Sequence, residues 1–324
     1  MNATPCRLVW FAVLSAALWV LSGCAQKTAT PLRVGTGVWP GYEIFYLARS
    51  LGYLDESLVH LVAFPGNPQV QHSFQNHALE AAALPRDEPL QLAQSHSDLR
   101  IVLALDFSNG ADGLIARPGV ETTGDLRGKK IGLEFNSGGS LILARALEAE
   151  GLALTEVEVV GISSADQLAA LRGGAVDAVV ACDPVRAQLL NLGAVQLFDS
   201  SRIFGEVMDV LVVSKSGLKN HDQSVRHLLA GWFRAVDYLK KNPQDAARRM
   251  ALRERLRPEE FLQVLRGLHI LDLNENHRLL DAEKGTLQEN MRRLSALMLR
   301  HGLLVRMPDP APLLTDQVLK EARL

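Results

Sequence analysis

The sequence predicts an α/β protein of two lobes, each a mostly parallel sheet flanked by helices, with a helical C-terminal extension. Three observations predict this fold class. Short apolar runs alternate with segments of helical spacing, which is typical of βαβ units. The alternation occurs twice, before and after Lys129, and from Asn220 onward the spacing is almost entirely helical. The 324 residues are enough for two such lobes.

The N-terminal 23 residues have the features of an export signal. Arg7 is the only charge before Lys27, and Leu8 to Leu21 is a nearly unbroken apolar run of 14 residues. That length fits a signal-peptide core of about 7–15 residues better than a membrane span of about 20. Small residues before Cys24 resemble the lipobox of bacterial lipoproteins, which implies cleavage before Cys24 and its acylation. A plain secretory signal that happens to contain a cysteine is the alternative.

Acylation at Cys24 would make the membrane a partner through a lipid anchor, because each buried CH₂ contributes about 0.8 kcal/mol. Residues 24–31 then form a polar tether, and we expect a periplasm-facing lipoprotein of the cell envelope. Cys6 leaves with the signal, so Cys182 is the remaining free thiol and no disulfide or cysteine metal site is expected. We expect Cys182 to be a core residue, and we expect no cofactor and no metal.

The elements follow in order after the tether. Apolar runs at 32–38, 59–64, 81–84 and 101–105 predict the strands of the first lobe, expected over residues 32–117. Runs at 131–135, 157–162, 176–182 and 195–198 predict those of the second lobe, expected over residues 118–208, with helices at 141–152, 165–171 and 185–192 between them. The chain then returns to the first lobe over residues 209–324, with a strand-like run at 210–213.

The helical extension has two clear signals. Apolar residues between Val225 and Leu239 recur at i, i+3 and i+4 and form one stripe, which predicts an amphipathic helix. Pro243 and Pro258 each precede a helical pattern, and proline is well placed at the first position of a helix. The segments 279–304 and 313–324 are also amphipathic.

The glycines near the start do not form a dinucleotide site. Gly35 and Gly37 begin a G-x-G pattern, but Pro40 stands where the third glycine should be. The next strand ends at Phe64 and Pro65 instead of an acid for a ribose hydroxyl. The chain also lacks a P-loop, a G-x-S-x-G turn and an H-E-x-x-H pair. A net charge of −2 gives no reason to expect nucleic acid as a partner.

Four stretches in order resemble a known family. "VWPGYEIFYLARSLGYLDE", "ALDFSNGADGLIARPGVETTGDLRGKKIGLE", "LRGGAVDAVVACDPVRAQLL" and "LFDSSRIFGEVMDVLVVS" are similar to segments of periplasmic solute-binding proteins of the nitrate, sulfonate and taurine class, relatives of the thiamine-pyrimidine synthase fold. The resemblance implies a type II-like periplasmic binding protein with two lobes that close on a small solute and deliver it to an ABC permease. Asp183 stands where this family more often has glutamate, which leaves the solute open.

The candidate ligand-binding residues fall into three groups. The first follows the first strand and comprises Trp39, Tyr42 and Glu43, which offer flat faces, polar tips and a carboxylate at a helix start. The second precedes an apolar helix, where free N–H groups and hydroxyls favour an anion, and comprises Ser137, Gly138, Gly139 and Ser140. The third contains acids at strand ends and crossovers, namely Asp112, Asp183 and Asp209, beside Asp106 and Glu134. Helix caps, core aromatics and salt bridges are the alternatives.

The second and third groups together suggest a zwitterionic solute, with its acidic group at the helix start and its amine at the acids. We therefore expect the solute-binding component of an ABC importer, a monomer that performs no chemistry on its ligand. Three rivals stay open: a sensor that passes its closed state to a membrane signalling protein, an enzyme of the thiamine-pyrimidine synthase type, and a lipoprotein that only makes contacts.

Overall fold

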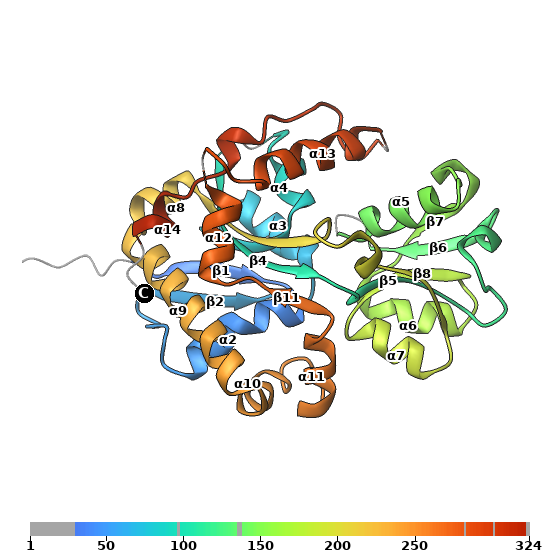
Figure 1. The fold of residues 1–324 in the computed structure, drawn as a ribbon, viewed down its shortest axis with the longest axis horizontal. Helices are drawn as coiled ribbons and strands as arrows, with labels where there is room; N and C mark the ends of the chain where they lie inside the picture. Colours follow the sequence, from blue (N-terminus) through green and yellow to red (C-terminus); the bar gives the residue numbers. More distant parts are fainter. Residues whose placement is uncertain (1–29, 96–97, 135–137, 282, 301, 322–324) are drawn as a thin grey trace, which may run out of the picture. The chain divides into compact units, whose positions relative to one another are not determined.

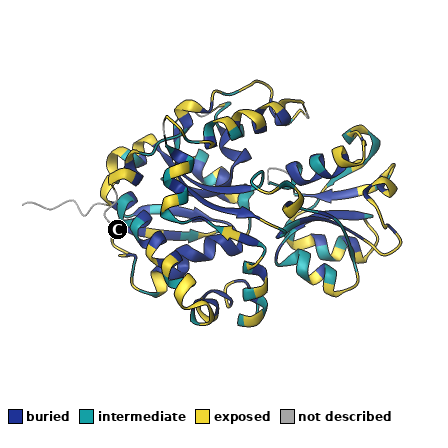
Figure 2. Cartoon of the chain, in the orientation of Figure 1, coloured by how far each residue is buried: buried dark blue, intermediate teal, exposed yellow. Residues whose placement is uncertain are grey.

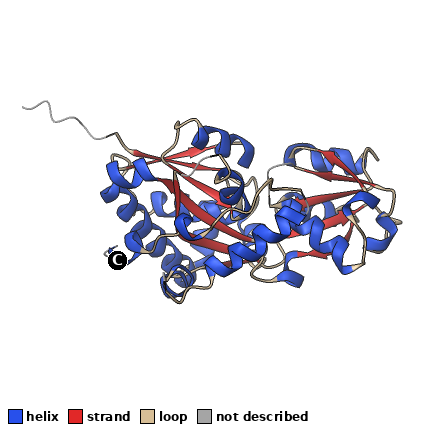
Figure 3. Ribbon diagram, turned by 90° about the horizontal axis from the view of Figure 1, so that it is seen from above, coloured by secondary structure: helices blue, strands red, loops and turns tan. Residues whose placement is uncertain are grey.

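The computed structural model describes residues 30–95, 98–134, 138–281, 283–300 and 302–321, and residues 31–324 form one compact unit. The predicted signal peptide, Cys24 and Ser137 lie outside the described residues. Two sheets flanked by helices make up the fold, which confirms the predicted α/β class (Figures 1 and 3). No helix among the described residues is both long enough and apolar enough to cross a bilayer.

The first sheet has six strands. In spatial order they are β11 (Leu268–Ile270), β4 (Leu99–Ser108), β10 (Met208–Ser214), β3 (Ala81–Pro85), β1 (Leu32–Thr36) and β2 (Val59–Ala63). β1 pairs in parallel with β2 and β3, while β10 runs antiparallel between β3 and β4. β10 is the strand by which the chain returns from the second sheet, so its opposite direction follows from its connection.

The second sheet has five strands. In spatial order they are β7 (Glu158–Gly161), β6 (Lys130–Leu133), β8 (Ala178–Cys182), β5 (Asp112–Ala116) and β9 (Val195–Asp199). β6 pairs in parallel with β7 and β8, and β5 pairs antiparallel with β8 and β9. The sequence predicts that the first lobe extends to residue 117. Residues 112–116 instead pair with β8 and β9 of the second sheet, so the chain passes from the first sheet to the second between Ser108 and Asp112.

Helices cover both sheets. Those that follow strands of the first sheet are η1 (Pro40–Tyr42), α2 (Glu43–Ser50), α3 (Asn67–Gln75), α4 (Asp87–Leu92) and α8 (Lys215–Asn220). Those around the second sheet are η2 (Thr123–Leu126), α5 (Gly139–Ala149), η3 (Leu154–Glu156), α6 (Ser164–Arg172), α7 (Val185–Asn191) and η4 (Ser200–Ile203). The C-terminal part is α9 (Asp222–Lys241), α10 (Pro243–Met250), α11 (Pro258–Leu265), α12 (Leu273–Leu280), α13 (Leu287–Arg300), η5 (Ala311–Leu313) and α14 (Gln317–Glu321).

The inner strands β3, β4, β8 and β10 are buried on both faces, whereas the edge strands β2, β7 and β11 have exposed residues, and the helices expose one face to solvent (Figure 2). In the second sheet, Leu114 packs into one apolar cluster, whereas its neighbour Ile115 packs into another on the opposite face. This alternation is the period of two that a strand imposes on its side chains. In the first lobe, Phe45 of α2 and Trp232 of α9 pack with their ring centroids 4.5 Å apart. The apolar stripe predicted over residues 225–239 is therefore the inner face of α9.

Candidate functional site

One cavity of about 110 Å³ is lined by residues of both sheets. It collects segments that follow the ends of β1, β2, β3, β6 and β8, together with residues of β5 and β10. Carboxyl ends of parallel strands are the usual place for a ligand in open α/β sheets, because the loops there can vary without disturbing the core. For scale, a cavity of about 150 Å³ can hold benzene, so the space suits a small solute.

An aromatic pair forms part of the cavity wall. Trp39 and Tyr42 lie on either side of Pro40, which starts the short helix η1, and they are only 6% and 1% exposed. The Trp39 indole Nε1 donates to both carboxylate oxygens of Asp106, each at 3.3 Å. The Tyr42 hydroxyl is buried without a well-formed hydrogen bond, although Asp209 lies close enough to affect its pKa. The wall thus contains two aromatic side chains and one hydroxyl without a well-formed hydrogen bond.

Three carboxylates lie close together behind and beside these rings. Asp106 and Asp209 are cross-strand partners on β4 and β10, and Asp112 begins β5. Burial raises the pKa of Asp106 to about 8 and that of Asp112 to about 6. The charge of Asp112 adds to the rise at Asp106, and the charges of Asp183 and Asp87 add to the rise at Asp112. Burial and the charges of Asp106 and Asp112 also raise the pKa of Asp209 well above its ordinary value.

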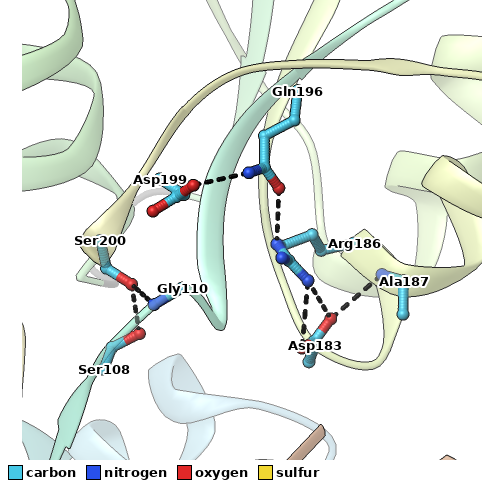
Figure 4. A network of polar contacts seen from close by, with 8 residues as sticks. All are labelled: Ser108, Gly110, Asp183, Arg186, Ala187, Gln196, Asp199 and Ser200. Carbon is cyan, nitrogen blue, oxygen red and sulfur yellow. Dashed lines mark hydrogen bonds and ion pairs between the residues drawn. The ribbon is translucent and has the colours of Figure 1, made fainter. Parts of the chain in front are cut away.

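Another carboxylate of the cavity wall, Asp183, is held by an arginine (Figure 4). Arg186 Nη1 lies 3.2 Å from Asp183 Oδ1, and the Ala187 backbone N–H donates to the same oxygen at 3.0 Å. The Arg186 Nε donates to Gln196 Oε1 at 3.1 Å, and Gln196 in turn donates to Asp199 at 2.6 Å. Burial raises the pKa of Asp183, and Arg186 opposes the rise. The Arg186 guanidinium therefore binds Asp183 and Gln196, which are both residues of the second lobe.

The two chain crossovers between the sheets are hydrogen-bonded to each other. Ser108 Oγ, at the end of β4, lies 2.7 Å from Ser200 Oγ on the returning segment, and the Gly110 N–H donates to Ser200 Oγ at 2.7 Å (Figure 4). Gly110 has φ +107 and Gly205, on the return, has φ +84. Both values favour glycine, so each crossover contains a residue whose backbone conformation a side chain would strain.

The structure brings most of the predicted residues to this cavity. Its lining includes seven of them, namely Trp39, Tyr42, Asp112, Gly138, Gly139, Asp183 and Asp209. Ser140 does not line it and instead borders a small space between α5 and α13. Glu43 does not line it either, because its carboxylate pairs with Arg253 at 3.0 Å.

Several lining residues were not predicted. Ser164 donates its backbone N–H and its hydroxyl to the Glu134 carboxylate, at 3.2 and 2.8 Å. The Gln167 amide donates to the Val180 carbonyl at 2.8 Å. Cys182, expected in the core, lines the cavity, and burial raises the pKa of its thiol well above the ordinary value. A lone serine, glutamine or cysteine in a helix or strand carries no local sequence signal, so only the tertiary fold reveals these positions.

The NMT1-like family model matches residues 25–253. The chain belongs to the NMT1-like family. A relative from Escherichia coli (strain K12), named for aliphatic sulfonate binding, is 23% identical over 227 residues, which cover 68% of this chain and 70% of the relative.

Solved structures share the fold of this NMT1-like protein. The alkanesulfonate-binding protein SsuA from Xanthomonas axonopodis pv. citri, bound to MOPS, has a TM-score of 0.73 at 19% identity and covers 87% of this chain and 97% of that one. The ligand-binding component of an ABC-type import system from Staphylococcus aureus, with zinc bound, has a TM-score of 0.75 at 14% identity and covers 91% and 99%. At these identities the likeness concerns the fold alone.

Proposed function

We propose that this NMT1-like protein is the solute-binding component of an ABC importer. It is anchored by lipid at Cys24, faces the periplasm as a monomer, and holds one small polar solute in the cavity between its lobes. Solutes of sulfonate, taurine or nitrate type and zwitterionic nitrogen compounds are the candidates. The proposed lobes are residues 32–108 with 208–324, and residues 112–207.

The observation that carries this proposal is the composition of the cavity wall. It is built from both sheets, it contains an aromatic pair, and it contains buried polar groups such as Asp209 and the Tyr42 hydroxyl. A binding site of this kind, mostly apolar with a few converging polar groups, is typical for small molecules. The sulfonate-binding and import-component names of the relatives point the same way.

Hinge closure is the proposed mechanism. Within the described ranges the chain passes between the two sheets at two crossovers, and each contains a glycine with positive φ, at Gly110 and Gly205. A few residues that absorb a change in backbone angles are sufficient for a hinge. Closure on the solute would complete the surface that the ABC permease recognises. Closure of the lobes is tested by small-angle X-ray scattering, in which a bound solute should reduce the radius of gyration of the protein.

The test of function is binding by residues 25–324, which contain the compact unit 31–324. The panel holds taurine, alkanesulfonates, nitrate, amino acids, polyamines and pyrimidines. A solute at 100 times its Kd should add about 2.7 kcal/mol to the free energy of unfolding. Trp39 lines the cavity, whereas Trp232 is fully buried between α2 and α9. The fluorescence response to solute should therefore vanish in Trp39→Phe and persist in Trp232→Phe.

The enzyme and contact-only rivals are tested in the same samples. Mass spectrometry of the bound solute after long incubation should return it unchanged. A converted product would favour an enzyme instead. If no member of the panel changes melting or fluorescence, the importer proposal fails and a contact-only role gains support.

A further inference from the structure

The charge of the cavity wall has a single sign. Among the described lining residues four are acidic and none is lysine, arginine or histidine. They are Asp112, Glu134, Asp183 and Asp209. Asp106, fully buried, lies directly behind Trp39. Where these acids are ionised, a sulfonate or nitrate placed here would meet like charges in a medium of low dielectric, in which repulsion is strong.

Two of these acids already have partners. Asp183 pairs with Arg186 and accepts the Ala187 N–H, and Glu134 accepts two hydrogen bonds from Ser164. They complete local networks of the second lobe. The acids of this set that lie outside these networks are Asp112, Asp209 and, behind Trp39, Asp106.

The remaining group contains hydrogen-bonding capacity that the chain itself does not use. The Asp112 Oδ2 atom is buried without a well-formed hydrogen bond, although the Ser108 hydroxyl interacts with the same carboxylate and opposes the rise of its pKa. The Tyr42 hydroxyl, on a side chain that is 99% buried, also lacks a hydrogen-bond partner of good geometry and lies near Asp209. Buried polar atoms without partners cost about 1–3 kcal/mol each. Such atoms in a cavity wall indicate a ligand with donors that face Asp112 and Asp209.

We propose that the solute carries a protonated amine, and that Asp209, Asp112 and the Tyr42 hydroxyl hold this ammonium group against the Trp39 and Tyr42 rings. The inference rests on the proposed function and narrows its solute class. An ammonium group has three donors and one positive charge, which match two carboxylates and one hydroxyl oxygen. Aromatic faces add attraction for a cation. Solutes that carry only a sulfonate or nitrate group are excluded.

The acids also give the binding a pH dependence. The ionisable groups that face Asp209 come from four elements: Asp106 on β4, Tyr42 on η1, Asp112 on β5, and Asp87 and Glu88 on α4. Asp112 is also faced by Asp183 and Arg186 of the second lobe. Without a bound solute, the cluster of Asp106, Asp112 and Asp209 retains protons near neutral pH. Ammonium binding displaces them, so affinity should rise between pH 6 and pH 8, by up to tenfold per pH unit for each proton displaced.

Three probes with a two-carbon chain separate the charges: ethylamine, taurine and ethanesulfonate. Larger amines, namely polyamines and aminopyrimidines, allow for a bigger solute. Melting and calorimetry of residues 25–324 should give binding only for probes with a protonated nitrogen. Binding of ethanesulfonate or nitrate without any amine would overturn the inference and leave the importer proposal standing. If none of the probes binds, both the ammonium inference and the importer proposal fail.

Variants locate the ammonium site. For the amine that binds, Asp209→Asn and Asp112→Asn should each weaken binding at least tenfold at pH 7.5, and Asp166→Asn, an exposed aspartate of α6, should not. Each cavity variant should melt at or above the wild-type temperature, because a buried carboxylate without a cation is removed. Unchanged amine affinity in both cavity variants would overturn the assignment.

Discussion

The Glu43 carboxylate lies 3.0 Å from the Arg253 guanidinium, which also covers the Tyr46 ring with Cζ 3.4 Å from its centroid. This contact joins α2 to the segment between α10 and α11, across 210 positions of sequence. Glu43 is almost fully buried, and burial raises its pKa to about 7 even though Arg253 opposes the rise. The pair is structural, and it explains why Glu43 turns away from the cavity.

Arg253→Met is expected to destabilise the protein by about 1–3 kcal/mol, below the usual cost for a buried pair because the arginine is partly exposed. The cost should be larger at pH 8 than at pH 5, since Glu43 is neutral at the lower pH. Chemical denaturation at both pH values measures it. Arg255→Met, at an exposed position of the same segment, is the control. Equal costs at both pH values would contradict the coupling to Glu43.

The free energy of unfolding should fall as the pH rises from 5 to 8. Several buried carboxyls have a pKa raised by burial into this window: Asp87 and Asp112 to about 6, Glu43 to about 7, and Asp106 and Glu254 to about 8. In this window the folded protein retains protons that the unfolded chain has released. Stability is therefore full below the unfolded pKa values and declines through the folded ones, by about 1.4 kcal/mol per pH unit for each retained proton.

Thermal melting across pH 5–8 checks this decline. Glu254→Gln should flatten the upper part of the curve, because it removes one of the raised groups. Glu260→Gln should leave the curve unchanged in this range, because an exposed ion pair with Arg257 lowers the pKa of Glu260. A melting temperature that rises steadily from pH 5 to pH 8 would contradict the assignment of retained protons.

Sequence pattern predicted most strands and helices of this protein because each depends on neighbouring residues. Pro243 and Pro258 do begin α10 and α11, and nine apolar runs correspond to strands. The strand at Asp112–Ala116 was missed, since five residues between a glycine turn and a proline have too few apolar positions to show a period. Its sheet could not be deduced either, because pairing is decided by partners far along the chain.

The cavity residues also divide into those that neighbouring residues reveal and those that depend on remote partners. Trp39, Tyr42 and Asp209 could be proposed because aromatic residues and acids at strand ends have a recognisable chemistry. The role of Glu43 could not be read locally, since its partner Arg253 is remote in sequence. Gln167 could not be found either, because it contributes to the cavity only where α6 meets β8.

Asn276→Ala should destabilise the protein by about 1–3 kcal/mol, the cost of leaving buried backbone groups without partners. The fully buried Asn276 amide accepts the Ala104 N–H at 2.8 Å and donates to the Ala104 carbonyl at 2.9 Å. It thus fixes α12 to β4. Urea denaturation gives the change, and Asn274→Ala, an exposed neighbour on the same helix, should cost much less. Equal costs would mean that this contact contributes little.

Cys24→Ser should release the protein from the membrane fraction and abolish labelling by radioactive palmitate in cells. The reason is that the proposed lipid attaches to the Cys24 thiol and the new N-terminus. Cys6→Ser is the matched control, because Cys6 lies before the proposed cleavage site and should leave labelling intact. Labelled Cys24→Ser protein would refute the lipoprotein proposal without affecting the cavity.

Gly41→Ala tests how rigidly the cavity wall is built. A Cβ at Gly41 would overlap Asp106 Oδ2 and lie 2.8 Å from Trp39 Nε1, so either the carboxylate or the indole must move. Overpacking of this kind costs about 1–3 kcal/mol, and the displaced groups should weaken solute binding as well. Gly124→Ala is the control, since its nearest neighbour would be Thr122 Oγ1 at 3.6 Å, an ordinary contact. If Gly41→Ala melts and binds like the wild type, the Trp39–Asp106 contact does not hold the wall in place.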